Sequence, residues 1–197
     1  MDRLHALVIV AALVGCDQGK PQGGGDPPSR VNGAKVATQQ GATVDAFCDV
    51  HQPDAAAPAF AWPKLVGAPA PGKAAGWRWV NVWATWCKPC IEEIPRLVAW
   101  RDKLSAAGVK LDLQLVSIDE EQADVDEYRK DHPNVPPTLR LADPTKTMGA
   151  WFKQAGLTGE PPIPVHIFVA PSGKVHCARA GGVREQDFAV VEKLFAE

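Results

Sequence analysis

The chain has 197 residues, 46% of them hydrophobic, so it can form one domain with a full hydrophobic core and an extension, but not two such domains. Its 21 basic and 23 acidic residues give a formal net charge of -2 and are mixed along the sequence, without the basic stripe that binding to nucleic acid requires. Five cysteines are an odd number, and each needs an explanation if the chain is exported, because thiols outside the cytoplasm tend to be oxidised.

The first residues are typical of an export signal. A charged start is followed by an apolar run at residues 6–15, which is shorter than the roughly 20 residues of a membrane-spanning helix. The run ends in the sequence LVGC at residues 13–16, which resembles a bacterial lipobox, in which the cysteine receives a diacylglycerol and becomes the mature N-terminus. We therefore expect a lipoprotein signal peptide at residues 1–15 and lipidation of Cys16. The alternative is ordinary secretion, with Cys16 removed or idle.

A lipid anchor would place the protein in the bacterial cell envelope, facing the periplasm. Asp17 resembles a signal for retention at the inner membrane in some bacteria. Residues 16–58 are expected to be a flexible tether and N-terminal extension, because residues 17–45 are rich in glycine and proline and poor in large apolar side chains. The last part of this segment, residues 46–58, is expected to be irregular but pinned to the domain that follows at residues 59–197.

From residue 59 the sequence alternates between strand and helix patterns. Strands are expected at residues 60–62, 77–83, 111–118, 165–170 and 174–180. Helices are expected at residues 89–106, 120–131, 144–154 and from Arg184 onward, with a kink at Pro95 in the first of them. This order predicts an α/β domain with a central mixed β-sheet flanked by helices and a terminal β-hairpin and helix.

The Cys87-Lys88-Pro89-Cys90 segment carries the chemistry. It lies between a predicted strand and a predicted helix, where the N–H groups of the first helical turn favour a thiolate on the first cysteine. Half of a zinc site has the same spacing, but the sequence contains no second Cys-x-x-Cys and no His-x(3–5)-His to complete it. The pair is therefore interpreted as a redox-active disulfide.

The sequence VWATWCKPC at residues 82–90 resembles the active-site segment of the thioredoxin superfamily, in its TlpA/ResA-like extracytoplasmic branch. The similarity covers residues 60–197 and implies a thioredoxin fold. Pro164 stands where the family places a cis-proline opposite the two cysteines. Pro161 and Pro162 are the alternatives, but Pro164 directly precedes the predicted strand.

The resemblance implies specific roles in the active site. Cys87, the first and more exposed cysteine, would attack a substrate disulfide, and Cys90 would resolve the mixed disulfide that results. Trp86, Lys88 and Pro89 complete the active-site loop, and Trp86 is expected to shape the surface on which a substrate docks.

The sequence departs from thioredoxin itself at Asn81, where thioredoxin has a buried aspartate that accepts a proton. The ResA-like branch resembles this chain in having asparagine there and a glutamate in the first part of the active-site helix, which is Glu93 here. A carboxylate beside the cysteines could move protons between them. The alternative is a solvated helical glutamate, as we expect for Glu92.

We expect no metal and no cofactor. His166 follows Pro164 in a predicted central strand and is interpreted as a core or rim histidine. The alternative is a metal ligand beside the active-site cysteines, but copper carriers of related fold space their cysteines one residue wider. Solvated-loop or strand-face positions are expected for the other histidines considered, His51, His132 and His176.

Cys48 and Cys177 are the pair left once Cys16 and the active-site cysteines are assigned. Export disfavours two free thiols, and in the thioredoxin fold the strand holding Cys177 lies at the edge of the sheet, within reach of a segment entering from the tether. We expect a structural disulfide between them. The alternative is two separately buried thiols.

The predicted function is thiol-disulfide oxidation and reduction, with electrons passed to disulfides of client proteins. The family resemblance suggests the cysteines of apocytochrome c as the target and implies an upstream dithiol electron donor in the membrane. The lipid anchor would attach the protein to the same membrane. A metal carrier of thioredoxin fold, for copper or another metal, is the alternative from a different class. A peroxidase is disfavoured because the sequence lacks a Pro-x(3)-Thr-x(2)-Cys site. The Lys88-Pro89 dipeptide predicts a reducing pair rather than an oxidising one.

Overall fold

The computed structural model describes residues 42–52, 55–67 and 69–197. The predicted signal peptide, Cys16, Asp17 and most of the predicted tether lie outside these residues. Within the described part of the chain, none of the helices combines the length and the apolar character needed to cross a membrane.

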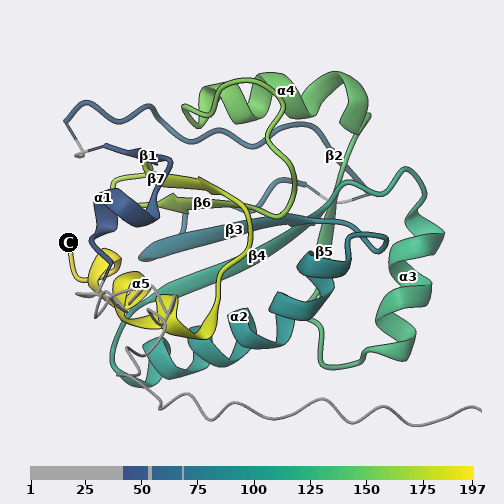
Figure 1. The fold of residues 1–197 in the computed structure, drawn as a ribbon. Helices are drawn as coiled ribbons and strands as arrows, with labels where there is room; N and C mark the ends of the chain where they lie inside the picture. The colour runs from purple at the N-terminus through teal and green to yellow at the C-terminus, as the bar shows by residue number, and fades with distance from the viewer. Residues whose placement is uncertain (1–41, 53–54, 68) are drawn as a thin grey trace, which may run out of the picture. The chain divides into compact units, whose positions relative to one another are not determined.

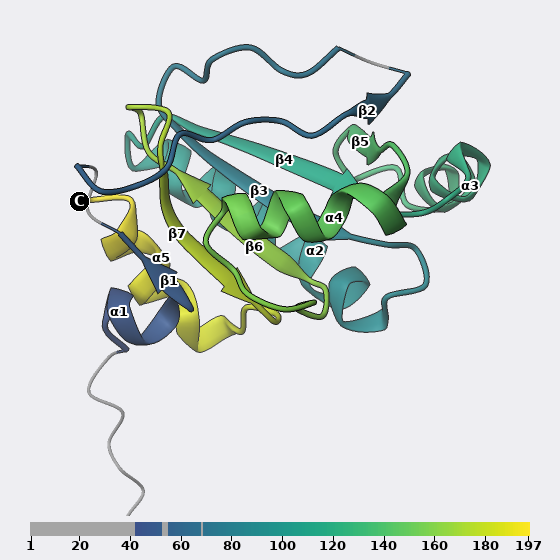
Figure 2. The same ribbon diagram turned by 90° about the horizontal axis from the view of Figure 1, so that it is seen from above.

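A seven-stranded mixed sheet forms the centre of the fold, in the order β1-β7-β6-β3-β4-β5-β2 (Figures 1 and 2). β3, β4 and β5 run parallel, whereas β6 and β7 form an antiparallel hairpin that pairs with β3 through β6. The short strands β1 and β2 close the two edges in antiparallel pairing with β7 and β5. The strands are β1 (Val50–His51), β2 (Leu65–Val66), β3 (Trp77–Trp83), β4 (Leu111–Ser117), β5 (Thr138–Leu141), β6 (Val165–Val169) and β7 (Val175–Ala180).

Helices lie on both faces of this sheet, as Figures 1 and 2 show from two directions. α2 and α5 cover one face and α4 lies over the other. α3 lies beyond the N-terminal end of α2. The helices are α1 (Val44–Phe47), α2 (Lys88–Ala106), α3 (Gln122–Asp131), α4 (Pro144–Gln154) and α5 (Phe188–Leu194), the last preceded by a 3-10 turn (Glu185–Asp187). The predicted α/β class with a terminal hairpin and helix is confirmed.

The central strand β3 is buried along its whole length. Its side chains alternate between the two faces, and Trp79 on the α2 face stacks on Phe168 of β6, with ring centroids 5.0 Å apart. Trp83 on the same face packs against Tyr128 of α3. A strand rich in aromatic and β-branched side chains is well suited to such a central position, because it fills both layers of the core.

Two differences from the predicted strands occur around β2. The prediction of a strand at residues 60–62 is wrong: Phe60 and Trp62 lie in an extended loop, where their rings pack edge to face and the Trp62 indole N–H donates to the carbonyl oxygen of Pro71. The loop then forms β2, which pairs with β5. β5 was not predicted because its polar and apolar side chains alternate over only four residues, which is too short a pattern to identify a strand.

Structure begins ahead of the boundary predicted at residue 59. Thr43 caps α1 by accepting a hydrogen bond from the backbone N–H of Ala46, and Phe47 packs against Phe168 in the core. β1 then adds an edge strand beside β7. Cys48 and Cys177 form a disulfide with an S–S distance of 2.04 Å and a Cα–Cα distance of 5.6 Å, which ties this segment to the sheet.

Candidate active site

The two cysteines of the Cys-x-x-Cys segment lie where β3 leads into α2. Cys87 is the N-cap residue of α2 and Cys90 lies in its first turn, and the two are joined in a disulfide. Both are largely buried, with Cys90 fully so and Cys87 5% exposed. Trp86, next to them, is 68% exposed and is the one large hydrophobic side chain that stands exposed among the described residues.

The start of α2 sets the electrostatics at Cys87. Backbone N–H groups in the first turn of a helix have no partner within the helix and carry partial positive charge, which stabilises a thiolate at the N-cap. Lys88 adds little to this, because its side chain is 86% exposed and its ammonium group lies 3.7 Å from the carboxylate of Glu92. The helix end is therefore the main source of positive potential at the Cys87 sulfur.

The loop between β3 and Cys87 is anchored by a buried carboxylate, that of Asp119. It accepts hydrogen bonds from the backbone N–H and the hydroxyl of Thr85, the latter at 2.7 Å, and from the hydroxyl of Ser117 at 2.6 Å. Asp119 was not predicted as a site residue, because nothing in its local pattern distinguishes it from the other acidic residues after β4. Its role follows from the parallel pairing of β3 and β4, which ends with Trp83 beside Ser117.

Pro164 lies against the first cysteine. The peptide bond between Ile163 and Pro164 is cis, and the carbonyl oxygen of Ile163 is 3.9 Å from the Cys87 sulfur. The carbonyl oxygen of Pro164 accepts a hydrogen bond from the backbone N–H of Gly181. The structure thus brings together Cys87 and the proline that the sequence analysis selected from three.

Glu93 is buried, not solvated. It lies three residues after Cys90 on α2, a spacing that puts two side chains on the same helix face, and it is 2% exposed. Its Oε1 accepts a hydrogen bond of 2.8 Å from the side-chain amide of Asn81, and its Oε2 accepts one of 2.9 Å from the backbone N–H of Val183. These donors compensate for the loss of water around a buried carboxylate.

His166 completes this buried group, which we call the Glu93 network (Glu93, Asn81, His166 and Trp79). The indole N–H of Trp79, which can only donate, lies 3.1 Å from His166 Nδ1. Nδ1 must therefore accept, and in the neutral ring the proton is on Nε2, which lies 3.3 Å from Glu93 Oε1. The histidine was expected in the core, where it lies, but its contact with Glu93 depends on the register that pairs Asn81 with His166.

A second helical residue holds the backbone that faces Glu93. Arg96, three residues further along α2, donates to the carbonyl oxygen of Val183 at 2.8 Å and also pairs with Glu185. Glu93 and Arg96 thus hold the N–H and the carbonyl group of one residue. This contact fixes the loop between β7 and α5 against the active-site helix.

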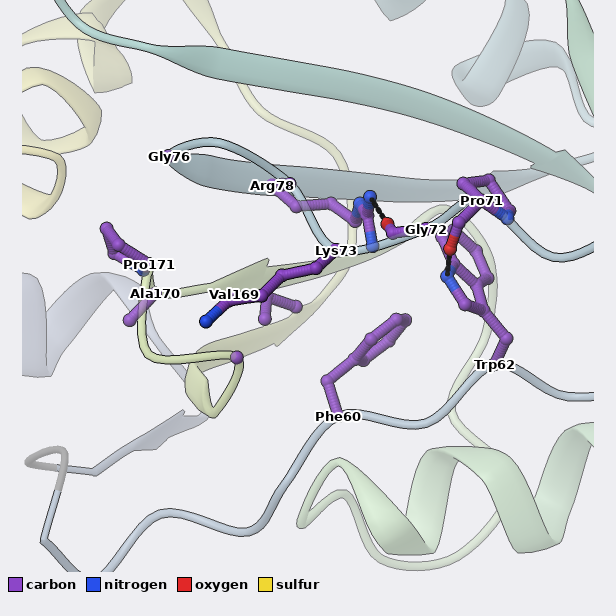
Figure 3. Close-up of a pocket in the computed structure, with 12 residues that line it drawn as sticks. Phe60, Trp62, Pro71, Gly72, Lys73, Gly76, Arg78, Val169, Ala170 and Pro171 are labelled. Carbon is purple, nitrogen blue, oxygen red and sulfur yellow. Dashed lines mark hydrogen bonds between the residues drawn. The ribbon is translucent and has the colours of Figure 1, made fainter.

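A cavity of about 230 Å³ lies at the opposite end of β3 (Figure 3). Trp62 and Arg78 line it, and the guanidinium of Arg78 is engaged by the carboxylate of Asp112 at 2.8 Å and by the carbonyl oxygen of Gly72. Because its one buried charge is paired and no cysteine or histidine lines it, the cavity has no redox chemistry. The Cys87 end of β3 is therefore the candidate active site.

Comparisons with known proteins agree with this fold. Residues 53–178 match the AhpC/TSA family. A secreted thiol-disulfide isomerase from Corynebacterium glutamicum has a similar structure, with a TM-score of 0.54 and 18% sequence identity over 75% of this chain and 97% of that one. A DsbF homologue from Corynebacterium diphtheriae gives a TM-score of 0.55 and 15% identity over 73% and 91% of the two chains. No curated protein matches the sequence.

Proposed function

Because this chain belongs to the AhpC/TSA family and is a thioredoxin-like thiol-disulfide oxidoreductase, we propose that it reduces disulfides of client proteins outside the cytoplasm. The observation that carries this proposal is the Cys87–Cys90 pair at the start of α2, with a buried carboxylate on the same helix face and an exposed tryptophan beside it. In the proposed cycle the pair starts as a dithiol and ends as the disulfide.

In the first step the Cys87 thiolate attacks one sulfur of the client disulfide. A bond forms between Cys87 and that sulfur while the client disulfide breaks, and the second client sulfur leaves as a thiolate that takes up a proton. The helix N-terminus stabilises the attacking thiolate. The exposed Trp86 supplies apolar surface beside the attacking sulfur, on which a client segment can dock.

In the second step Cys90 attacks Cys87 and releases the client. Cys90 must first lose its proton, and we assign the acceptor role to Glu93, which lies on the same helix face. The new Cys87–Cys90 bond forms as the mixed disulfide breaks, and the departing client thiolate takes up a proton. Two electrons have then passed from the dithiol to the client disulfide.

The Glu93 network is suited to a carboxylate that changes its protonation state. Asn81 donates to Glu93, whereas an aspartate at that position would place a second carboxylate within hydrogen-bonding distance and oppose the charge of the first. The Nε2 of His166 lies 3.3 Å from Glu93 Oε1, so its proton interacts with the charge on that oxygen. This arrangement supports a single buried acid, fixed in orientation by neutral donors.

We further propose where the protein is held and which client it reduces. Lipidation of Cys16 would hold the protein at the membrane, facing the periplasm, with residues 16–58 as the tether. There an upstream membrane dithiol would return electrons to the pair. The cysteines of apocytochrome c are the clients that the resemblance to the TlpA/ResA-like branch favours.

A metal carrier that uses the two active-site cysteines and His166 fits the structure less well. Both ring nitrogens of His166 face protein groups, Nδ1 the indole of Trp79 and Nε2 the carboxylate of Glu93. Nδ1 accepts from the indole and Nε2 carries the proton in the neutral ring, so neither nitrogen offers a free lone pair to a metal ion at the sulfurs. The buried histidine is better explained as part of the Glu93 network.

Trapping of the mixed disulfide tests the proposal. With Cys90→Ala the first step proceeds and the second cannot, so envelope proteins with reducible disulfides should accumulate on Cys87. A Cys87→Ala/Cys90→Ala variant is the matched control and should trap none. Equal trapping by both variants, or none by Cys90→Ala in cells that contain an apocytochrome c, would contradict the proposed function.

A further inference from the structure

Two histidines and a carboxylate meet at the edge of the sheet, far from the active site in sequence. His51 of β1, His176 of β7 and Glu197 after α5 direct one ligand atom each to a common point, with all three atoms within 4.8 Å of one another. Both histidines lie on strands, in agreement with the predicted strand-face position, but their contact with each other was not predicted. The sequence could not indicate this, because 125 residues separate the two.

The spacing of these atoms fits a coordination sphere. The two Nε2 atoms are 3.2 Å apart, and Glu197 Oε2 lies 3.1 Å from His51 Nε2 and 2.7 Å from His176 Nε2. Ligand atoms at about 2.1 Å from a tetrahedral zinc ion are about 3.4 Å apart. Two of the three distances agree with this value within a few tenths of an ångström, and a small movement of the glutamate side chain would adjust the third.

The outer nitrogen of His51 indicates which atom of that ring carries a lone pair. His51 Nδ1 lies 2.6 Å from Asp45 Oδ1, so in the neutral ring Nδ1–H donates to this carboxylate and Nε2 is left as a lone-pair donor. A carboxylate behind a histidine is the usual outer partner of a metal ligand. His176 presents Nε2 to the same point. The Nδ1 of His176 has no hydrogen-bond partner among the described residues, so its Nε2 either donates a proton to Glu197 or offers a lone pair to a cation at this point.

We propose that His51, His176 and Glu197 bind one divalent transition-metal ion, with zinc as the best match, and that Asp45 orients His51 in this site. Two nitrogen ligands and one carboxylate suit zinc, which completes a tetrahedron with a water molecule. Magnesium and calcium prefer oxygen ligands and are excluded by the two imidazoles.

The site is separate from the redox centre. His176, the second residue of β7, packs against Trp77, the first residue of β3, whereas Cys87 lies four residues beyond the end of β3. Seven residues of strand lie between these ends, or roughly 20 Å. In Figure 1 the C-terminus, α1 and β1 lie at one end of the sheet and the start of α2 at the other.

An ion here would link three segments that are distant in the chain. His51 belongs to the N-terminal segment, His176 to the edge of the sheet and Glu197 to the residues after α5. Cys177 pairs with His51 across the two strands, so the Cys48–Cys177 disulfide holds the ligands in place before the ion binds. The ion would act as a structural link at the edge of the sheet, with no part in electron transfer.

A shared proton is the competing explanation for the same contacts. Burial opposes protonation of His51, but hydrogen bonds to Asp45 and Glu197 outweigh it and raise the pKa of the ring above its ordinary value. A proton would then take the place of the metal between the ligands. The two explanations differ in whether zinc binds with a defined stoichiometry.

Zinc titration of the full chain, with both disulfides formed so that these cysteines cannot coordinate metal, tests the proposal. We expect one zinc ion per chain by calorimetry, an affinity lowered by on the order of 100-fold in His51→Ala and in Glu197→Gln, and one lowered about 10-fold or more in Asp45→Asn. Zinc should raise the melting temperature of the parent chain and not that of His51→Ala, and magnesium should do neither.

His132→Ala is the matched control, because this exposed histidine stacks on Tyr128 in a different part of the molecule. It should bind zinc as the parent chain does. A Cys87→Ser/Cys90→Ser variant should also bind zinc normally, which separates this site from a carrier that uses the active-site thiols. Absence of binding, or binding that His51→Ala and Glu197→Gln leave unchanged while circular dichroism shows them folded, would overturn the proposal.

Discussion

Two buried disulfides lie in different parts of the same domain, and they differ in the length of chain they close and in the groups beside them. Cys87 and Cys90 are three residues apart at a helix N-terminus, next to an exposed tryptophan. Cys48 and Cys177 are 129 residues apart and join the N-terminal segment to β7, which is not the edge strand that the sequence predicted, because β1 pairs along its outer side. Both are disulfide bonds, so the difference between a redox role and a structural role comes from what surrounds each of them.

The loop that each bond closes explains much of this difference. In the chain-entropy treatment a loop as short as that of the active-site pair is worth about 2 kcal/mol, whereas a loop of the length closed by Cys48 and Cys177 is worth about 5 kcal/mol. The short loop can therefore open and close in each cycle with little effect on folding. The long loop stabilises the fold only while it stays closed.

Removal of the attacking thiol should have the largest effect. Cys87→Ser leaves a hydroxyl that is not ionised near neutral pH, so reduction of a model protein disulfide should fall by on the order of 10³-fold or more. Cys48→Ser is the matched control and should retain most of the rate under conditions where it is folded. An insulin-reduction assay checks both, and comparable losses in the two variants would contradict the division of roles.

Removal of the other disulfide should act on stability. A Cys48→Ala/Cys177→Ala variant should lose about 3–5 kcal/mol of unfolding free energy, because the denatured chain regains the freedom that the long loop removed. The reduction potential of the active-site pair should stay unchanged. Urea denaturation monitored by tryptophan fluorescence measures the loss, and an unchanged midpoint would show that strand pairing alone holds the N-terminal segment.

Loss of the buried carboxylate should slow one step. Glu93→Gln keeps the shape but cannot accept a proton, so release of the client from the mixed disulfide should slow by about 100-fold, with a smaller effect on its formation. Glu92→Gln, which alters the exposed neighbour, should leave both steps unchanged. Stopped-flow kinetics over a range of pH separates the steps. An equal slowing of both steps in Glu93→Gln would indicate a purely structural role.

The smallest effect is expected at the exposed tryptophan. Trp86→Ala should leave the reduction potential unchanged and raise the KM for a protein client several-fold, since removal of an exposed aromatic contact weakens binding by about 1 kcal/mol. A small disulfide that needs no docking surface should be reduced at the parent rate. Equal losses with both substrates would place Trp86 in the chemistry rather than in docking.

Features that depend on a local sequence pattern could be predicted from the sequence. Contacts that depend on which strands pair, and in which register, could not. The strand-to-helix transition at Cys87 and the alternation of strands and helices are local features, and the family resemblance added Pro164 and Glu93. The partners of Glu93 are not local, because His166 and Val183 reach it only through the order of the strands. For the same reason the contact between His51 and His176 could not be predicted.

Separate reduction potentials for the two disulfides provide the most direct test of this division. The protein is equilibrated with dithiothreitol or glutathione buffers, the thiols are alkylated, and each pair is quantified by mass spectrometry. Cys87–Cys90 should titrate nearer to about -270 mV than to about -120 mV, because the helix end is the main thiolate-stabilising feature and Lys88 is exposed and paired with Glu92. Cys48–Cys177 should titrate below about -300 mV. An active-site potential more oxidising than about -180 mV, or reduction of Cys48–Cys177 before the active-site pair, would contradict the account.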